Sequence, residues 1–307
     1  MREAFVNSLV DLASKDKNIV LLTADLGFGV FERFEQLYPD QFYNVGIAEQ
    51  NMVGVGTGLA LEGKKVVIYS IGNFPTLRCL EQIRNDACYH EINMTIISSG
   101  GGYSYGALGY SHHATEDLSI MRAIPNMKVI APCSKWESGQ AIEALINDNS
   151  VSYLRLDKTA ANDDQIKKNN FNILTSRRYK EGSDISLIAT GGILKEVLKA
   201  AIILEKKSIS CRVIAMHTVK PLDNLEIDAA IMETNGIVTI EENNIIGGLG
   251  SAISEYCMNT SKIPKKFLSI GINDCYSSIV GSQDYLRTHN NLDSESIATN
   301  VVSLLNR

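Results

Sequence analysis

The sequence predicts two α/β domains, each built on a mostly parallel sheet with helices on both faces. Short apolar runs alternate regularly with stretches of helical spacing along the chain. The apolar runs are of the fully buried type that is typical of strands in a parallel sheet. A polar, charged segment without periodicity interrupts this alternation at 162–170. We therefore expect a larger domain at 1–160, a linker at 161–180 and a smaller domain at 181–307.

The first domain begins with a helix over 2–14, in which Phe5, Leu9 and Leu12 recur at helical spacing. Short runs of β-branched and aliphatic residues predict its strands at 19–25, 65–70, 94–99, 127–132 and 151–156. Its further helices are expected at 49–61, 77–89, 118–123 and 134–147. A long glycine-rich loop follows the strand at 94–99, at the edge where parallel sheets place their ligands.

The alternation restarts in the second domain, after strand-like sequence around 171–174. Strands are expected at 185–191, 210–216, 236–241 and 265–271. Helices are expected at 194–206, 225–233, 249–258 and 294–305. The second domain is therefore a smaller α/β unit of the same general kind.

The composition argues against several classes of function. Apolar residues make up 45% of the 307 residues and charged residues 21%, as in a globular protein. A net charge of −6 gives no reason to expect nucleic acid or an anionic membrane as a partner. The N-terminal segment does not resemble a signal peptide, and no run approaches the roughly 20 apolar residues of a membrane span. We expect a cytoplasmic protein.

Neither the cysteines nor the glycines indicate a metal or nucleotide site. The six cysteines are scattered, which favours reduced and mostly buried thiols over zinc ligands or disulfides. Gly54, Gly56 and Gly58 lie inside an expected helix rather than in the turn before one. The run Gly247-Gly248-Leu249-Gly250 precedes a helix, but without the acidic residue of a dinucleotide site, and no Gly-Lys-Ser phosphate loop is present.

The stretch from Tyr43 to Met52 is the most informative part of the sequence. Glu49 stands at the expected start of a helix that is rich in glycine. Each interior glycine costs a helix roughly 1 kcal/mol relative to alanine, so we expect another backbone to pack closely against this helix at a domain or subunit contact. Glu49 has two interpretations. The spacing alone favours a first-turn glutamate that complements the helix dipole, and the alternative is a buried carboxylate that exchanges a proton with a ligand nitrogen.

The run Gly46-Ile47-Ala48-Glu49-Gln50-Asn51-Met52 resembles a motif of transketolase-like enzymes that depend on thiamine diphosphate. The resemblance implies a pyrimidine-binding domain with the thiamine-diphosphate-binding fold, followed by a smaller transketolase C-terminal domain to which we assign no chemistry. In this family the glutamate contacts N1′ of the cofactor's aminopyrimidine ring, which implies a catalytic and cofactor-binding role for Glu49. Phe74 matches the aromatic residue that stacks on this ring, although alone it could be an ordinary core phenylalanine.

The same resemblance implies further cofactor contacts. Asp25, within Ala24-Asp25-Leu26, matches a family segment after the first strand. Ile47 and Arg78 are implied to bind the cofactor as well.

The implied substrate contacts lie in the loop after the strand at 94–99 and near two arginines. Ser111-His112 fits the family's Asp-Gly-x-Thr/Ser-His-Gln motif, so His112 is the implied active-site histidine and a substrate contact. Its place in a glycine-rich loop after a parallel strand favours this role over a structural one. Arg2 and Arg155 match the arginines that hold a ketose phosphate in the family.

The sequence departs from the family at three substrate positions. Leu108 replaces the aspartate that reads a sugar hydroxyl, and Gly100 and Gly29 fall near the places of a phosphate-binding histidine and serine. Fewer phosphate ligands imply a different acceptor, or a substrate with another anionic or an uncharged end. A specialised sugar pathway is therefore as compatible with the sequence as the pentose phosphates.

The sequence contains no Gly-Asp-Gly…Asn motif, which in the family holds magnesium and the diphosphate. The chain thus resembles the C-terminal subunit of a split transketolase, which moves a two-carbon ketol unit from a ketose or ketose phosphate to an aldose. The resemblance implies a separate N-terminal subunit that holds Mg²⁺, a cofactor across the subunit interface, and an α2β2 heterotetramer. Two alternatives stay open: the beta subunit of a 2-oxoacid dehydrogenase, with which Tyr153 to Lys158 is compatible, and a non-catalytic scaffold subunit.

Overall fold

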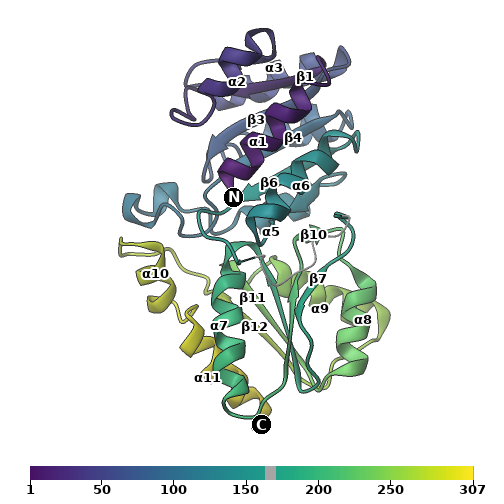
Figure 1. Cartoon of the computed structure of the whole chain (residues 1–307), viewed down its shortest axis with the longest axis vertical. Coiled ribbons are helices and arrows are strands. Elements are labelled where there is room, and N and C mark those ends of the chain that lie inside the picture. The colour runs from purple at the N-terminus through teal and green to yellow at the C-terminus, as the bar shows by residue number, and fades with distance from the viewer. Residues whose placement is uncertain (163–170, 307) are drawn as a thin grey trace.

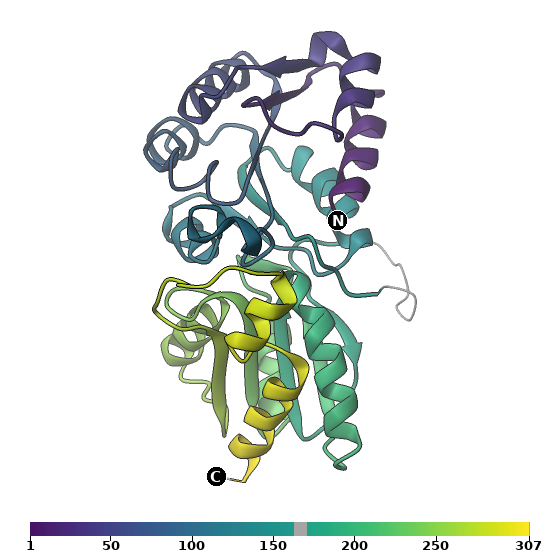
Figure 2. The same cartoon turned by 90° about the vertical axis from the view of Figure 1, so that its left-hand side faces the viewer.

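A computed structural model of the protein describes residues 1–162 and 171–306. The predicted linker at 161–180 falls partly on residues 163–170, which lie outside the described residues. The two α/β units predicted from the sequence are stacked along the long axis of the molecule (Figures 1 and 2). The predicted fold class, with a parallel-sheet first domain and a smaller second domain, is confirmed.

The first sheet has seven strands in the order β10-β5-β6-β4-β3-β1-β2. Neighbouring strands are parallel except for β10, which comes from the second half of the chain and pairs antiparallel with β5. The strands are β1 (Ile19–Thr23), β2 (Phe42–Asn44), β3 (Lys65–Ile71), β4 (Met94–Ser99), β5 (Lys128–Ile130), β6 (Val151–Leu156) and β10 (Thr218–Lys220). Because β10 extends this sheet, the second half of the chain is joined to the first by backbone hydrogen bonds as well as by side-chain packing.

Helices cover both faces of the first sheet. Buried side chains of α1 and α6 pack on one face, and those of α3 and of a π-helical turn at Ile83–Cys88 pack on the other. The helices are α1 (Arg2–Ala13), α2 (Glu32–Leu37), α3 (Glu49–Leu61), α4 (Leu80–Gln82), α5 (Asp117–Ala123) and α6 (Lys135–Ile146). The carboxyl ends of the strands are left for the connecting loops, as in other open parallel sheets.

The second sheet has five strands in the order β12-β11-β8-β9-β7, parallel except for the edge strand β7. The strands are β7 (Arg177–Lys180), β8 (Ile185–Thr190), β9 (Cys211–Ala215), β11 (Ile237–Asn244) and β12 (Phe267–Ile272). Helices α7 and α11 pack on one face, and α8 and α9 on the other. The helices are α7 (Leu194–Glu205), α8 (Asn224–Glu233), α9 (Leu249–Thr260), α10 (Gln283–His289) and α11 (Ser294–Leu305).

Two element predictions were wrong. The helix expected at 77–89 is instead the short α4 followed by the π-helical turn, a geometry that is frequent at functional sites. The segment 171–174 forms no strand. Ile173 and Phe171 instead pack against the first domain, where the Phe171 ring contacts the Trp136 ring at 5.9 Å between centroids, whereas Leu174 is exposed.

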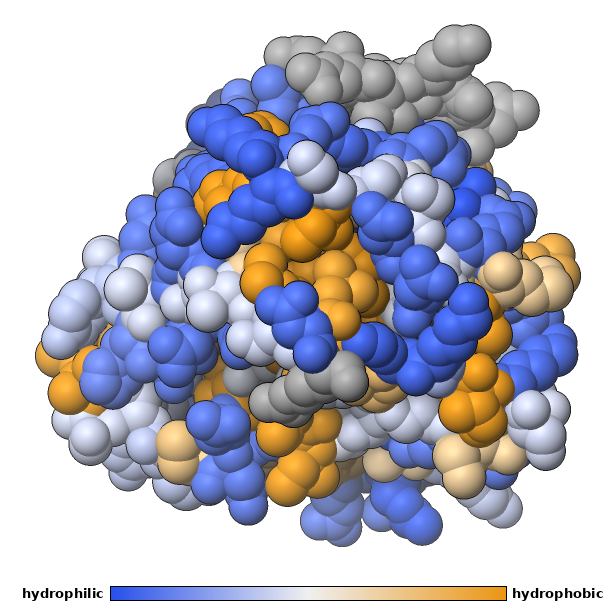
Figure 3. All heavy atoms as spheres, turned by 90° about the horizontal axis from the view of Figure 1, so that it is seen from below, coloured by the Kyte–Doolittle hydropathy of each residue, from blue (hydrophilic) through white to orange (hydrophobic). Residues whose placement is uncertain are grey.

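The described residues include no helix that is both long enough and apolar enough to cross a membrane. Seen from the end formed by the second domain, polar and charged residues surround a central group of apolar ones (Figure 3).

Candidate functional site

Helix α3 begins at Glu49, as predicted, and Glu49 as a whole residue is only 2% exposed. The turn before it is shaped by Asn44, whose Oδ1 accepts hydrogen bonds from the Asp25 and Gly46 N–H groups at 2.9 and 3.0 Å. Gly46 has a φ of +76°, which glycine adopts without strain. These hydrogen bonds to the Asn44 side chain hold the turn between β2 and the helix.

The glycines of α3 serve two different faces. A Cβ atom at Gly56 would lie 2.9 Å from Met94 Cε and 3.1 Å from Val66 Cγ1, so this glycine lets the helix approach the sheet closely. Nothing lies within 4 Å of a Cβ atom built at Gly54 or Gly58. Gly56 thus packs against side chains of its own sheet, whereas the face that carries Gly54 and Gly58 is open, and the expected contact with another domain or subunit stays a prediction.

Glu49, Arg78 and Phe74 form one contiguous group. Arg78 Nη1 donates to Glu49 Oε2 at 2.6 Å. The same guanidinium lies over the Phe74 ring, with its carbon 4.5 Å from the ring centroid. The Arg78 side chain is 45% exposed, whereas that of Glu49 is 3% exposed. A buried carboxyl and an aromatic face thus share one movable, planar N–H donor.

His112 lies beside this group. Its ring centroid is 5.2 Å from that of Phe74, and its Nδ1 is 3.1 Å from Ser111 Oγ. A Cβ atom at Gly72 would lie 2.8 Å from the His112 carbonyl oxygen, so the close approach of the loop requires glycine here, where φ is +52°. The structure therefore brings Glu49, Arg78, Phe74 and His112 into one row of contacts.

Asp25 and Ile47 border this row. Asp25 has a φ of +54°, and its Oδ1 accepts from Asn44 Nδ2 at 3.1 Å, which ties the end of β1 to the end of β2. Ile47 is 80% exposed, so its side chain is available to another molecule. The cofactor roles of both residues stay predictions.

The two predicted substrate arginines differ in their surroundings. Arg2 is exposed at the start of α1. The pKa of Lys158 is lowered mainly by burial and, to a smaller extent, by the positive charge of Arg2. Arg155 is 2% exposed. It donates to Asp157 Oδ1 at 3.0 Å, Asp117 Oδ1 at 3.2 Å and the Glu242 carbonyl at 2.8 Å. These contacts tie Arg155 to the second domain through the Glu242 carbonyl, and its substrate role stays a prediction.

The residues around Arg155 were not predicted from the sequence. The pKa of Asp117 is raised, because burial outweighs two opposing contacts. These contacts are the charge of Arg155 and the Tyr153 hydroxyl, which donates to Asp117 Oδ2 at 2.5 Å. Asp157 Oδ2 accepts from the Gly192 N–H at 2.6 Å, which connects the end of β6 to the second domain. The sequence offered one indication of this group, which is that a cation, Arg155, and an anion, Asp157, stand together at the end of a strand.

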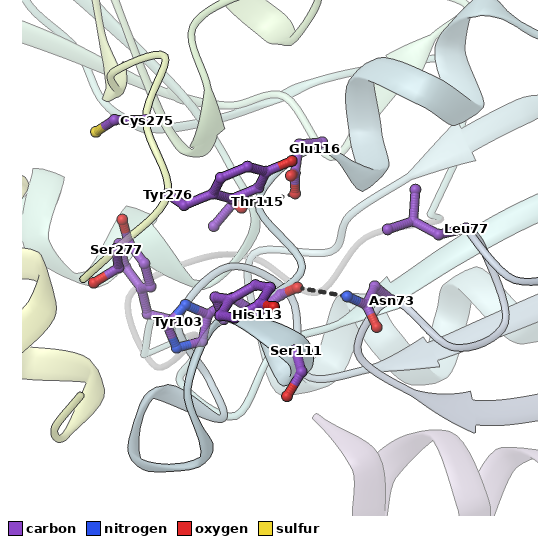
Figure 4. Close-up of a pocket in the computed structure, with 11 residues that line it drawn as sticks. Asn73, Leu77, Tyr103, Ser111, His113, Thr115, Glu116, Cys275, Tyr276 and Ser277 are labelled. Atoms are coloured by element: carbon purple, nitrogen blue, oxygen red, sulfur yellow. Dashed lines mark hydrogen bonds between the residues drawn. The ribbon is translucent and has the colours of Figure 1, made fainter. Parts of the chain in front are cut away.

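A cavity of about 140 Å³ is lined by residues of the His112 loop and of both domains (Figure 4). Figure 4 shows the Tyr103 and His113 rings together beneath Tyr276, and the Asn73 amide directed at the His113 carbonyl, to which it donates at 3.2 Å. Burial lowers the pKa of His113. The residues that line the cavity are Asn73, Leu77, Tyr103, Tyr110, Ser111, His113, Thr115, Glu116, Cys275, Tyr276 and Ser277.

Both halves of the chain match described domains. The transketolase pyrimidine-binding domain matches residues 1–163, and the transketolase C-terminal domain matches residues 175–304. The chain belongs to the transketolase family. Within residues 1–162 and 171–306, no group of three His, Cys, Asp or Glu side chains could hold a metal ion. That a partner subunit holds Mg²⁺ stays a prediction.

Relatives of this transketolase-family chain match it along its whole length. It is 32% identical to one of the apulose-4-phosphate transketolase subunits of Phocaeicola vulgatus, over 100% of this chain and 97% of the relative. It is 33% identical to the 6-deoxy-6-sulfo-D-fructose transketolase subunit SqwH of a Clostridium species, over 97% of this chain and 92% of the relative. A solved structure of a split gene transketolase, an inactive beta4 tetramer, superposes with a TM-score of 0.90 at 32% identity, covering 99% of this chain and 98% of that one.

Proposed function

We propose that this chain is the C-terminal subunit of a two-polypeptide transketolase that uses thiamine diphosphate. The observation that carries the proposal is the position of the Arg78 guanidinium, which is hydrogen-bonded to Glu49 and lies over Phe74. A protonated aminopyrimidine has the same two properties, since it is planar and donates N–H bonds. The pair Glu49 and Phe74 therefore fits the pyrimidine half of the cofactor.

The exposed Arg78 side chain could turn aside for the ring and still lie within reach of it. Ile47 and Asp25 would border the ring, as the resemblance implies. When bound, thiamine diphosphate supplies the carbon nucleophile and electron sink that carbon–carbon bond cleavage beside a ketone requires.

The residues of this chain supply proton transfer and orientation. Glu49 would hold a proton and exchange it with N1′ of the pyrimidine, which requires a carboxyl group shielded from water. Its 2% exposure supplies that shielding. His112 would bind the oxygens of the ketose donor, because it stands next to Phe74 with one ring nitrogen not engaged by Ser111.

The open face of α3 supports a partner subunit. Gly54 and Gly58 leave room for another backbone, and Val55 and Leu61 on the same helix are 39% and 60% exposed. A separate N-terminal subunit packed here would bring its diphosphate and Mg²⁺ site toward Glu49. We propose an α2β2 heterotetramer on this basis.

The substrate is proposed to differ from the standard pentose phosphates. A Cβ atom at Gly100 would overlap the Tyr105 ring, so Tyr105 occupies space that a phosphate-binding histidine would need. Leu108, in the place of the sugar-binding aspartate, is 56% exposed and holds no polar group toward a sugar. We expect poor turnover of xylulose 5-phosphate with ribose 5-phosphate, and better turnover after Leu108→Asp. An ordinary rate of about ten per second for the unaltered complex with this pair would contradict the idea.

The function is tested by purifying this chain together with its N-terminal subunit and adding thiamine diphosphate, Mg²⁺ and hydroxypyruvate or pyruvate. Ketol transfer from hydroxypyruvate to an aldose is the expected result. Oxidative decarboxylation of pyruvate would identify a 2-oxoacid dehydrogenase subunit instead. Inactivity toward both would favour a scaffold subunit. Because the diphosphate site is assigned to the partner, calorimetry should find that this chain alone binds the cofactor more weakly than about 1 μM.

A further inference from the structure

The loop that carries His112 is closed at its base by a two-way backbone pairing. The Gly102 N–H donates to the Ala114 carbonyl at 2.7 Å, and the Ala114 N–H donates to the Gly102 carbonyl at 3.0 Å. His112 stands two residues before Ala114. This neck, defined as the Gly102–Ala114 pair, therefore holds the base of the loop that carries the His112 imidazole.

The carboxyl end of β11, in the second domain, holds both limbs of the neck. Glu242 Oε1 accepts from the Tyr103 N–H at 2.6 Å on the outgoing limb. The Asn244 N–H donates to the Thr115 carbonyl at 2.6 Å on the returning limb. One strand end of the second domain thus binds the loop on each side of its neck.

Glu242 is itself fixed within the second domain. Its side chain is 1% exposed and pairs with the equally buried Arg287, whose Nε donates to Oε2 at 2.6 Å. Gln283 Nε2 donates to Glu242 Oε1 at 2.9 Å and to Ser104 Oγ at 3.3 Å. The Glu242 carboxylate is therefore held in one position by the second domain, and its bond to the Tyr103 N–H holds the loop in turn.

The first residues of the loop are fitted to these groups. Gly102 has a φ of +56°, and a Cβ atom there would lie 2.5 Å from Glu242 Cγ. A Cβ atom at Gly101 would overlap the Arg155 guanidinium, and one at Gly106 would lie 2.6 Å from the Gly281 carbonyl oxygen. The glycines of this loop are thus required where side chains and backbone of β6 and of the second domain press against it.

We propose that Glu242 is a positioning residue for His112, through which the second domain acts on ketol transfer from outside the site. The inference rests on the proposed function, in which His112 binds the substrate. Glu49 and Arg78 stand on α3 and on the segment after β3, and neither contacts the neck. Loss of the Glu242 contact should therefore impair substrate turnover while cofactor activation at Glu49 continues.

The test compares Glu242→Gln with Glu255→Gln, a control at a more exposed ion pair between the domains. Glu255 pairs with Arg122 through two contacts of 2.7 Å, also between the two domains, but it has no contact with the loop. In the isolated full chain, amide hydrogen exchange of residues 100–116 should accelerate about tenfold in Glu242→Gln. It should be unchanged in Glu255→Gln. Unchanged exchange in both variants, or equal acceleration in both, would overturn the proposal.

The second arm uses the complex with the N-terminal subunit. Ketol-transfer kcat/KM should fall about 10²-fold in Glu242→Gln, the scale expected when a reacting group is misplaced by about 1 Å. Exchange of the C2 proton of thiamine diphosphate should stay within about twofold of the unaltered complex. An equal loss in both measurements would mean general destabilisation and would overturn the positioning role.

Glu242→Gln strands the buried Arg287 and could prevent folding, so Gln283→Ala serves as a milder variant. It removes the hydrogen bonds to Glu242 and Ser104 without leaving a buried charge unpaired. In Gln283→Ala, amide exchange of residues 100–116 should accelerate about threefold and ketol-transfer kcat/KM should fall about threefold. Absence of these two changes would overturn the proposal. If the unaltered complex shows no ketol transfer, the proposed function fails, whereas the hydrogen-exchange arm still decides whether Glu242 holds the loop.

Discussion

Each domain places a buried glutamate at the N-terminus of a glycine-containing helix, and the two differ in what binds them. Both oxygens of Glu241 accept backbone hydrogen bonds of α9, from Leu249 at 2.8 Å and Gly250 at 2.9 Å. Glu49 accepts from Arg78, a half-exposed side chain. Fixed backbone donors cannot leave a carboxylate, but a side chain can. The two glutamates are therefore equally buried but differ in their donors, which are fixed backbone groups for Glu241 and a half-exposed side chain for Glu49.

Two histidines, His112 of the first domain and His217 of the second, differ in how deeply they are buried. His112 is half-buried beside Phe74 at the edge of the first sheet. His217 is fully buried, with its ring 4.8 Å from the Phe171 ring, and burial lowers its pKa to about 4. We therefore expect substitutions at Glu49 and His112 to affect activity, and substitutions at Glu241 and His217 to affect stability.

The largest effect is expected for Glu49→Gln. Glutamine keeps the size of the side chain and can accept from Arg78, but it cannot exchange a proton with N1′. Ketol transfer and C2 proton exchange in the assembled complex should both fall by about 10² or more. The melting temperature should change little, and cofactor affinity should fall less than turnover.

A first-turn glutamate that serves only the helix dipole would behave in the opposite way. It contributes about 0.3–1 kcal/mol to stability and nothing to catalysis. Near-normal turnover and near-normal C2 exchange in Glu49→Gln would therefore remove the main support for the proposed function.

The second effect is expected for Glu241→Ala, the counterpart in the second domain. The variant leaves two N–H groups at the start of α9 without their acceptor, which should lower the free energy of unfolding by about 2 kcal/mol. Urea unfolding of the isolated chain measures this. The folded complex should retain ketol transfer. Lost activity at unchanged stability would show that the two glutamates do not differ as argued.

Much of the fold could be predicted because its strands and helices are short periodic segments. The predictions for 94–99, 151–156 and 294–305 coincide with β4, β6 and α11. The antiparallel strand β10 could not be predicted, since it is only three residues long and belongs to the second half of the chain, yet pairs with the edge of the first sheet. Its pairing depends on how the two domains meet, which local sequence does not specify.

The site was predictable where a motif is contiguous and not where distant segments meet. Glu49 and His112 were predicted as site residues from short runs of sequence. The position of Arg78 over Phe74 depends on the irregular turn before α4, and the surroundings of Arg155 depend on Asp117, Asp157 and the β11 end. Those groups converge only after the domains have packed, so the interdomain role of Arg155 could not be predicted from its place on a strand.

A third, smaller effect tests His112. His112→Phe keeps a ring beside Phe74 but removes hydrogen bonding to the substrate. The kcat/KM for the ketose donor should fall about tenfold, as expected for the loss of one hydrogen bond, while C2 proton exchange stays unchanged. Steady-state kinetics and deuterium exchange on the same preparation measure both. A parallel loss of C2 exchange would mean that His112 contributes to the cofactor rather than to the substrate.

The smallest effect concerns His217 and appears only as a pH dependence. Burial lowers the pKa of His217 to about 4, below its value of about 6.5 in an unfolded chain. Because the unfolded chain binds the proton more tightly, this residue contributes stability above about pH 6.5 that is lost as the pH falls toward 4. His217→Phe retains a ring against Phe171 and cannot be protonated. From about pH 7 to about pH 5.5 the unaltered chain should lose about 1 kcal/mol more of its unfolding free energy than the variant.

Burial raises the pKa of Glu241 to about 7, which gives a pH dependence of opposite sign, but both chains contain Glu241 and its contribution cancels in the difference. Urea unfolding at the two pH values measures this difference, and identical pH dependence in both chains would mean that His217 is not held neutral by its surroundings.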